Sequence, residues 1–271
     1  MKRLIFTLLI ATIFMTVSAQ DTPKDTIKKT ADTTTNGPKV LISYGFGDKE
    51  YKWSKDSTHY KKRYPKFTLG LTLSRLDLGL TTLIDHGSFT LSPQNQFLRY
   101  RQWKSSNNGF DFFQMGVRFN DSFKIYLSGG FDWTLIRLRE NITILPNQPV
   151  LTYRQDSISY SKNRFSASYL RIPISFDFRT KEDRRGNRTH FVIGPIGGFL
   201  LDGMVKQISE EHGKQKMWDS YHFASFRYGA FTRIGYGLFG IYAKYYFNNM
   251  FEDSPAQDGL RNFSFGFTLG F

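Results

Sequence analysis

The stretch "RNFSFGFTLGF", residues 261–271, decides the fold class of this chain. Four phenylalanines and one leucine occupy every second position from Phe263 to Phe271, and small or polar residues lie between them. Because side chains alternate across a β-strand, this segment has one apolar face and one small polar face. On the edge of a soluble sheet, such a strand would promote aggregation. It must therefore lie inside a packed sandwich or against the lipid around a membrane barrel.

The same alternation recurs upstream. In the segment that begins at Phe67, the apolar phase reverses after Ser74, which predicts a β-bulge at about that position. Pro173 and Pro195 lie within two other segments and argue against ordinary central pairing there, although β-bulges could accommodate them. With the final strand the alternating segments number eight, and a closed antiparallel barrel requires an even number. The other segments are residues 67–80, 113–120, 123–137, 169–179, 190–203, 226–236 and 238–247.

The connections between these segments alternate in length. Short ones follow the second, fourth and sixth segments, and long ones follow the first, third, fifth and seventh. Outer-membrane barrels have this arrangement, with short periplasmic turns and long outer loops, so we expect both termini to be periplasmic. The expected turns are residues 120–122, 180–189 and 235–237, and the expected loops are residues 84–109, 140–164, 206–219 and 248–261.

The polar faces distinguish a barrel from a soluble sandwich, which would also alternate because it buries one face. They carry charges of both signs between glycines. Inside a small barrel such charges can pair with one another. We therefore predict an all-β fold, an eight-stranded antiparallel up-and-down transmembrane β-barrel, with a lumen-facing charge network. The expected members of the network are Arg118, Asp132, Arg171, Asp177, Arg227, Arg233 and Lys244.

The first 19 residues are expected to be a secretory signal peptide. Lys2 and Arg3 precede an apolar run, and the small residues at 17–19 resemble a cleavage site. The run is shorter than the ~18 residues that a spanning helix needs. No cysteine follows, which excludes a lipid-anchored lipoprotein and a disulfide framework. We expect a signal peptide at 1–19, a largely disordered periplasmic leader at 20–66 and the barrel at 67–271.

The composition fits an exported barrel. The net charge is +14, and export argues against nucleic acid as the partner and favours anionic surfaces such as phosphorylated lipid headgroups. Alternatively, much of this charge is solvated in turns, loops and the leader. The mean hydropathy of −0.40 would suit a soluble protein, but only alternate residues of a barrel strand are apolar. The aromatic share of 17% suits the aromatic girdles of such a barrel.

Several stretches resemble a known family. "SKNRFSASYLRIP", "VIGPIGGFLL", "GKQKMWDSYHFASFRYGAFTRIGY" and the ending "FSFGFTLGF" are similar to the small outer-membrane β-barrel proteins of Bacteroidota, the PorT-like group. The resemblance covers about residues 67–271 and implies an eight-stranded barrel in the outer membrane of a Gram-negative bacterium. It implies little about activity, although a minority of members are linked to protein secretion and gliding.

The sequence offers few groups for catalysis. None of its five histidines has zinc-ligand spacing and cysteine is absent, so we expect neither a metal nor a cofactor. One enzymatic alternative is a lipid A hydrolase or acyltransferase, because His222 and Ser225 lie near the outer end of a strand. Only Asp219 is available to orient the histidine.

We therefore expect a structural or interaction role: membrane integrity, surface contact or assistance to protein export. Side chains fill the interior of an eight-stranded barrel, so we expect a plugged lumen, with a narrow channel as a further alternative. The expected partners are outer-membrane lipid and lipopolysaccharide, the β-barrel assembly machinery during insertion, and protein-export components if the chain is secretion-linked; we expect a monomer. The candidate contact patch, for which the alternative is a solvated loop, comprises Arg99, Arg101, Trp103 and Lys104.

Overall fold

The computed structural model describes residues 41–42 and 64–270. The expected signal peptide, most of the expected leader and Phe271 lie outside the described residues. Within the leader, β1 (Leu41–Ile42) pairs in parallel with β2 (Lys66–Asp85) at Thr68 and Leu69. No helix among the described residues is long and apolar enough to cross a membrane.

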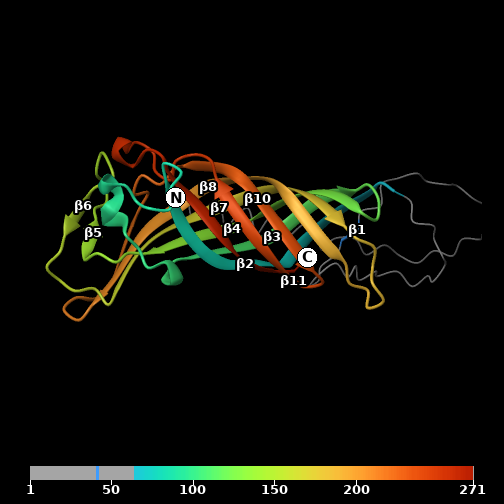
Figure 1. Cartoon of the computed structure of the whole chain (residues 1–271), viewed down its shortest axis with the longest axis horizontal. Helices are drawn as coiled ribbons and strands as arrows, with labels where there is room; N and C mark the ends of the chain where they lie inside the picture. The colour runs from blue at the N-terminus through green and yellow to red at the C-terminus, as the bar shows by residue number, and fades with distance from the viewer. Residues whose placement is uncertain (1–40, 43–63, 271) are drawn as a thin grey trace, which may run out of the picture. The chain divides into compact units, whose positions relative to one another are not determined.

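Eight antiparallel strands form a closed ring, as the alternation predicts (Figure 1). Each strand of the ring pairs with the next along the chain, and the last pairs with β2 to close it. Closure lets the strands satisfy one another's backbone hydrogen bonds, which a hydrocarbon environment requires. After β2 the ring consists of β3 (Ser106–Arg118), β4 (Phe123–Arg137), β7 (Lys162–Arg179), β8 (Thr189–Ser209), β10 (Phe226–Tyr236), β11 (Phe239–Tyr246) and β12 (Leu260–Leu269).

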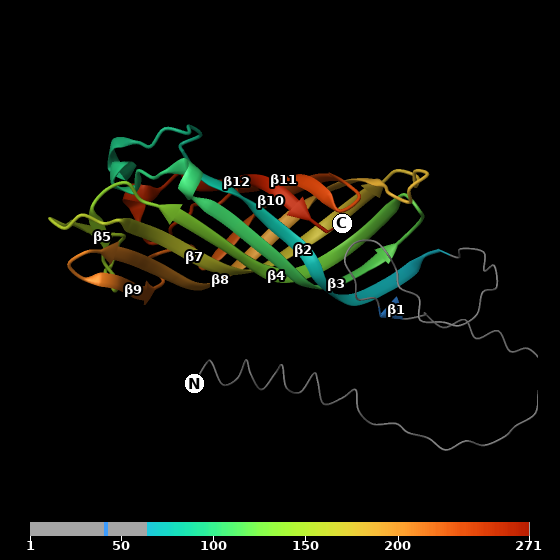
Figure 2. The same ribbon diagram turned by 90° about the horizontal axis from the view of Figure 1, so that it is seen from below.

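The connections alternate as expected. Residues 119–122, 180–188 and 237–238 make the short turns of one end of the barrel, here called the short-turn end. The other end, the long-loop end, carries residues 86–105, 138–161, 210–225 and 247–259. The loop expected at residues 206–219 is wrong in part, because β8 continues to Ser209 and folds back into β9 (Gly213–Asp219), which lies outside the ring (Figure 2). The long loops also hold β5 (Ile142–Ile144), β6 (Tyr153–Gln155) and the 3-10 helices η1 (Pro93–Leu98), η2 (Gln102–Lys104) and η3 (Pro255–Gln257).

The apolar faces of the strands point outward. In β12, Phe267 is 71% exposed, whereas the neighbouring Thr268 is fully buried. A soluble sandwich would bury its phenylalanines between two sheets, and monomeric soluble proteins rarely expose an apolar surface this extensive. The outer face therefore suits hydrocarbon. Other large apolar side chains exposed on it include Ile174, Phe178, Phe191, Ile193, Phe199, Ile234, Phe239, Ile241 and Phe265.

Bulges decide which charges face inward. The bulge predicted near Ser74 is confirmed, because the β2–β3 register shifts between Leu71 and Arg75. A second register shift, between β3 and β4, lies at Asp111. A bulge reverses the alternation of the strand beyond it. As a result, Asp77 and Asp111 are fully buried inside the barrel.

The strands pair through both prolines without a shift of register, contrary to expectation; Pro195 pairs with Ala230 of β10. Pro173 pairs with Ile196, and the same register continues to the pair of Phe176 with Ile193. A proline lacks the N–H that donates to the ladder, so it removes hydrogen bonds without displacing the strand.

Apolar side chains fill the long-loop end. Strand residues that face inward, such as Leu83 and Phe165, pack there against loop residues in one buried cluster. The ring of Phe165 stacks on that of Phe223 with a centroid distance of 4.5 Å. The loops are therefore part of the folded core of the barrel.

Asp156 anchors the loop between β4 and β7. Its carboxylate accepts hydrogen bonds from Thr143, from Tyr160 at 2.9 Å and from Arg154 at 3.0 Å. Gln207 of β8 donates to Thr143 at 2.9 Å and so ties this cluster to the barrel wall. Burial alone would raise the pKa of the Asp156 carboxyl, but these hydrogen bonds outweigh burial and lower the pKa below its usual value.

We expect Asp156→Asn to open this loop. A carboxylate whose folded pKa is depressed stabilises the native state above its ordinary pKa, 3.8, and loses that effect as the pH falls toward the folded pKa. At neutral pH the variant should lower amide protection in residues 142–144 by roughly tenfold, equivalent to about 1.4 kcal/mol. Hydrogen exchange corrected for intrinsic rates measures this. Protection in the wild type should fall below pH 3.8 and change little in the variant; an equal effect of the exposed control Asp253→Asn would contradict the assignment.

Candidate functional site: a buried charge network

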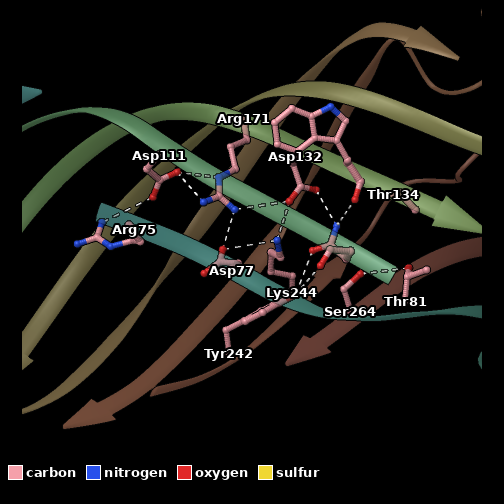
Figure 3. Close-up of polar contacts among 12 residues, drawn as sticks. Arg75, Asp77, Thr81, Asp111, Asp132, Thr134, Arg171, Tyr242, Lys244 and Ser264 are labelled. Atoms are coloured by element: carbon pink, nitrogen blue, oxygen red, sulfur yellow. Dashed lines mark hydrogen bonds and ion pairs between the residues drawn. The ribbon is translucent and has the colours of Figure 1, made fainter. Parts of the chain in front are cut away.

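Eight charged side chains from six strands meet inside the barrel. Figure 3 labels Arg75, Asp77, Asp111, Asp132, Arg171 and Lys244 among them. They include five of the seven residues predicted for the lumen network, and all eight are buried. We call this set the lumen network: Arg75 and Asp77 of β2, Asp111 of β3, Asp132 of β4, Arg171 of β7, Arg227 and Arg233 of β10, and Lys244 of β11.

Arg171 connects all three carboxylates. Its Nε donates to Asp111 Oδ1 at 2.7 Å, and its Nη1 donates to Asp77 Oδ2 at 2.7 Å. The same Nη1 lies 3.5 Å from Asp132 Oδ1. A planar guanidinium with donors in fixed directions suits this bridging role, which a lysine could not perform.

Asp132 is the second centre of the network. It accepts a hydrogen bond from Lys244 Nζ at 2.7 Å and another from Arg227. Arg227 is also held between two aromatic rings, with its guanidinium carbon 3.7 Å from the Tyr169 centroid and 4.1 Å from that of Tyr246. Cation–π contact partly replaces the solvation that the buried guanidinium loses.

The remaining cations share these carboxylates. Arg233 donates to Asp77 Oδ2 at 2.9 Å, and Lys244 lies 3.7 Å from the same oxygen. Arg75 Nη1 lies 3.7 Å from Asp111 Oδ2. Each carboxylate therefore has at least two cationic neighbours, as a buried charge needs if its desolvation is to be compensated.

Glycines make room for the network. A Cβ atom at Gly109 would lie 2.0 Å from Arg171 Nη1, and one at Gly130 would lie 2.7 Å from Asp111 Oδ1. These glycines face the lumen on β3 and β4, so charged side chains from other strands occupy the space beside them. The glycines between charges in the sequence thus have a packing role.

Asp177 and Arg118 lie outside the lumen network. Asp177 accepts hydrogen bonds from Arg179 Nε at 2.7 Å and lies 3.2 Å from His190 Nδ1, near the short-turn end. Arg118 is half-buried at the end of β3, in register with Lys124. Both predicted residues therefore belong to the short-turn end of the barrel and not to its centre.

Sequence reasoning missed Arg75, Asp77 and Asp111. The available signal was the reversal of the apolar phase after Ser74, which turns the odd-numbered positions of β2 inward. In β3 the adjacent Phe112 and Phe113 mark the corresponding irregularity next to Asp111. A register shift moves every later side chain to the opposite face, so these carboxylates could be placed only once both bulges were located.

The hypothetical catalytic group is not assembled. His222 Nε2 lies 2.7 Å from the carbonyl oxygen of Gln148, and Ser225 Oγ donates to Glu252. Asp219 accepts the N–H of Asn147 at 2.9 Å, so the three side chains bond to three different partners. Among the described residues, no group of three or more metal-binding side chains is arranged to hold an ion.

The candidate contact patch lies in the first long loop. Trp103 in η2 is 87% exposed, and Arg99 lies 3.6 Å from Glu140. The N–H of Arg101 donates to the carbonyl of Arg137 at 2.8 Å, which places the patch beside the end of β4. Lys104 ends η2 and is exposed.

We expect Arg171→Ala to destabilise the barrel by about 3–5 kcal/mol, because it leaves carboxylates buried without their shared cation. Urea unfolding in lipid vesicles, followed by the gel shift of the heat-modifiable barrel, measures the loss. The exposed Arg185→Ala should change stability by less than about 0.5 kcal/mol. Adding Asp111→Asn should recover part of the loss in the Arg171 variant, and strictly additive effects would contradict the bridging role.

The match to a family model agrees with the observed architecture. A family model described as "Outer membrane protein beta-barrel domain" matches residues 66–252. A search of curated proteins finds no match. The crystal structure of Ail, the attachment invasion locus protein of Yersinia pestis, in complex with the heparin analogue sucrose octasulfate, is 14% identical, with a TM-score of 0.31; the match covers 73% of this chain and 94% of that one. Since the family model spans more than half of the sequence, the chain belongs to the outer membrane protein β-barrel domain family.

Proposed function

We propose that this outer-membrane barrel has a structural or interaction role, with a closed lumen and no catalysis. The observation that carries the proposal is the lumen network, in which Arg171 joins three buried carboxylates across the barrel. An ion would have to break these short contacts in order to pass. The apolar cluster of the long-loop end is a second obstacle in its path.

The proposed orientation places the short-turn end and both termini in the periplasm. It is supported by the alternation of short and long connections, which outer-membrane barrels share. The long loops would then face outward and would be the surface available to partners. They contain the contact patch of Arg99, Arg101, Trp103 and Lys104, which we propose for lipopolysaccharide phosphates or a partner protein.

The finer classification is also a proposal. The stretches "SKNRFSASYLRIP" and "GKQKMWDSYHFASFRYGAFTRIGY" support membership of the PorT-like small barrels of Bacteroidota. We propose outer-membrane lipid, lipopolysaccharide and the β-barrel assembly machinery as partners of a monomeric chain. Export components that copurify from detergent-solubilised membranes would support the secretion-linked subgroup.

We expect the purified protein to show no steady conductance in planar bilayers, because ion pairs and apolar side chains occupy its lumen. Protein-free bilayers and a general porin in the same bilayer serve as negative and positive controls. A stable open current from the wild type would contradict the closed lumen and favour the narrow channel.

Deletion of the gene should leave lipid A unchanged. His222, Ser225 and Asp219 bond to separate partners, so they lack the mutual contacts that a hydrolase or acyltransferase needs. Mass spectrometry of lipid A from deleted and complemented strains tests this. A mass change that is restored by the wild type but not by His222→Ala would establish the enzymatic alternative.

A further inference from the structure

Basic side chains lie directly opposite one another on adjacent strands near the long-loop end. Arg164 of β7 pairs in register with Arg137 of β4 on one side and with Lys206 of β8 on the other. Lys206 in turn pairs with Lys216 of β9. Two positions further along β8, Ile208 pairs with Lys162 of β7 on one side and with Lys214 of β9 on the other. We call these six cations together the basic row: Arg137, Lys162, Arg164, Lys206, Lys214 and Lys216.

The basic row lies on the outer wall of the barrel. The side chains that alternate with it, including Ile136, Phe165 and Gln207, are buried inside. Since successive side chains of a strand point to opposite faces, the cations between them point outward. Across four strands spaced by about 4.8 Å, Arg137 to Lys216 spans roughly 14 Å.

This arrangement is unfavourable for the isolated protein. Like charges directly opposite one another destabilise a sheet, and here three such pairs follow in sequence across the strands. Within the part of the chain that the structure describes, no carboxylate forms an ion pair with a member of the row. Arg137 donates a hydrogen bond to the carbonyl oxygen of Ser161, whereas the Nε atom of Arg164 is buried and has no hydrogen-bond partner. Glu210 and Glu211 lie beyond the row, in the turn between β8 and β9.

The basic row borders the apolar outer face. Leu135 precedes Arg137 by two positions on the same face of β4, and Met204 precedes Lys206 in the same way on β8. Trp218 of β9 pairs with Met204 and is 57% exposed. Tryptophan is enriched at the boundary between hydrocarbon and headgroups, so the row lies at headgroup level.

The wall of the barrel opposite the basic row carries different outward side chains. At the long-loop end of β10, β11 and β12, the outward side chains are Phe226, Tyr228, Tyr245 and Arg261. Arg261 is the one cation among these four side chains, and it donates to the hydroxyl of Tyr245 at 3.2 Å. Positive charge is therefore denser on the outer face of β4, β7, β8 and β9 than on that of β10, β11 and β12.

We propose that the basic row binds the phosphate groups of a phosphorylated glycolipid in the outer leaflet. The inference rests on the proposed orientation, in which the long-loop end faces outward. A lipid in that leaflet would bring phosphates to the level of the cations, while its acyl chains would contact Leu135, Met204 and Trp218. Confinement to the membrane raises the effective concentration of such a ligand at the wall. An acidic protein would instead have to approach these cations through the headgroup region of the membrane.

Native mass spectrometry of the full protein in detergent tests this proposal. The probes are bis-phosphorylated lipid A, its dephosphorylated counterpart, inorganic phosphate and polyglutamate. The test variant is Lys162→Gln/Arg164→Gln/Lys206→Gln. Each basic residue near an anionic surface contributes about 1 kcal/mol, so this variant should bind bis-phosphorylated lipid A on the order of 100-fold more weakly than the wild type.

The matched control removes the same charge at the opposite end. Lys181→Gln/Arg184→Gln/Arg185→Gln changes three exposed cations in the turn between β7 and β8 and should bind as the wild type does. Gel shift of the heat-modifiable barrel verifies that both variants fold. Three results would overturn the proposal. The two variants could bind bis-phosphorylated lipid A equally well, or the wild type could bind the dephosphorylated lipid as tightly as the phosphorylated one. The third such result is that the wild type prefers inorganic phosphate or polyglutamate to lipid A. The measurement is independent of orientation and conductance, so such a result would leave the proposed closed lumen and the proposed orientation intact.

Discussion

Hydrocarbon cannot hydrogen-bond to a backbone, and this constraint governs the whole molecule. Pairing of β12 with β2 closes the ring, so that the strands satisfy one another. Once the ring is closed, successive side chains of each strand face the lipid and the lumen in turn. The phenylalanines of β12 take the lipid side, and Ser264 and Thr268 take the lumen side. The buried charge network and the lumenal glycines follow from this alternation, because every second side chain of each strand must fit into the narrow interior of the barrel.

An interior of this size holds side chains and little else, so its charges must compensate one another. Arg171 contacts carboxylates from three different strands and therefore links parts of the barrel that are distant in sequence. Gln207 extends the polar contacts toward the long-loop end, where its amide donates to the Ile142 carbonyl at 3.0 Å. The loops are thus held by the same wall that the charges hold together.

The sequence predicted what depends on local alternation and missed what depends on register. Eight strands, the order of short and long connections and the bulge near Ser74 all have signals within a few residues. Which charged residues meet inside the barrel has no such local signal, because Asp77 and Asp111 face inward only through bulges in their own strands. Asp177 has the inward position expected of it, yet its height along the barrel gives it Arg179 and His190 as neighbours.

The same alternation divides the charged residues of the strands into two groups, one that faces the lumen and one that faces outward. Lumenal cations have carboxylates within reach because strands on opposite sides of a small barrel approach one another across it. Outward cations have no opposite strand, so Arg164 and Lys206 can be neutralised only by their neighbours in the sheet, which are also basic. One such residue on a single strand would need no explanation, but the register aligns basic residues from four strands. Because no carboxylate of the described sheet forms an ion pair with these cations, their counter-charge would come from the medium, and phosphate is the anionic group that membrane headgroups supply at that level.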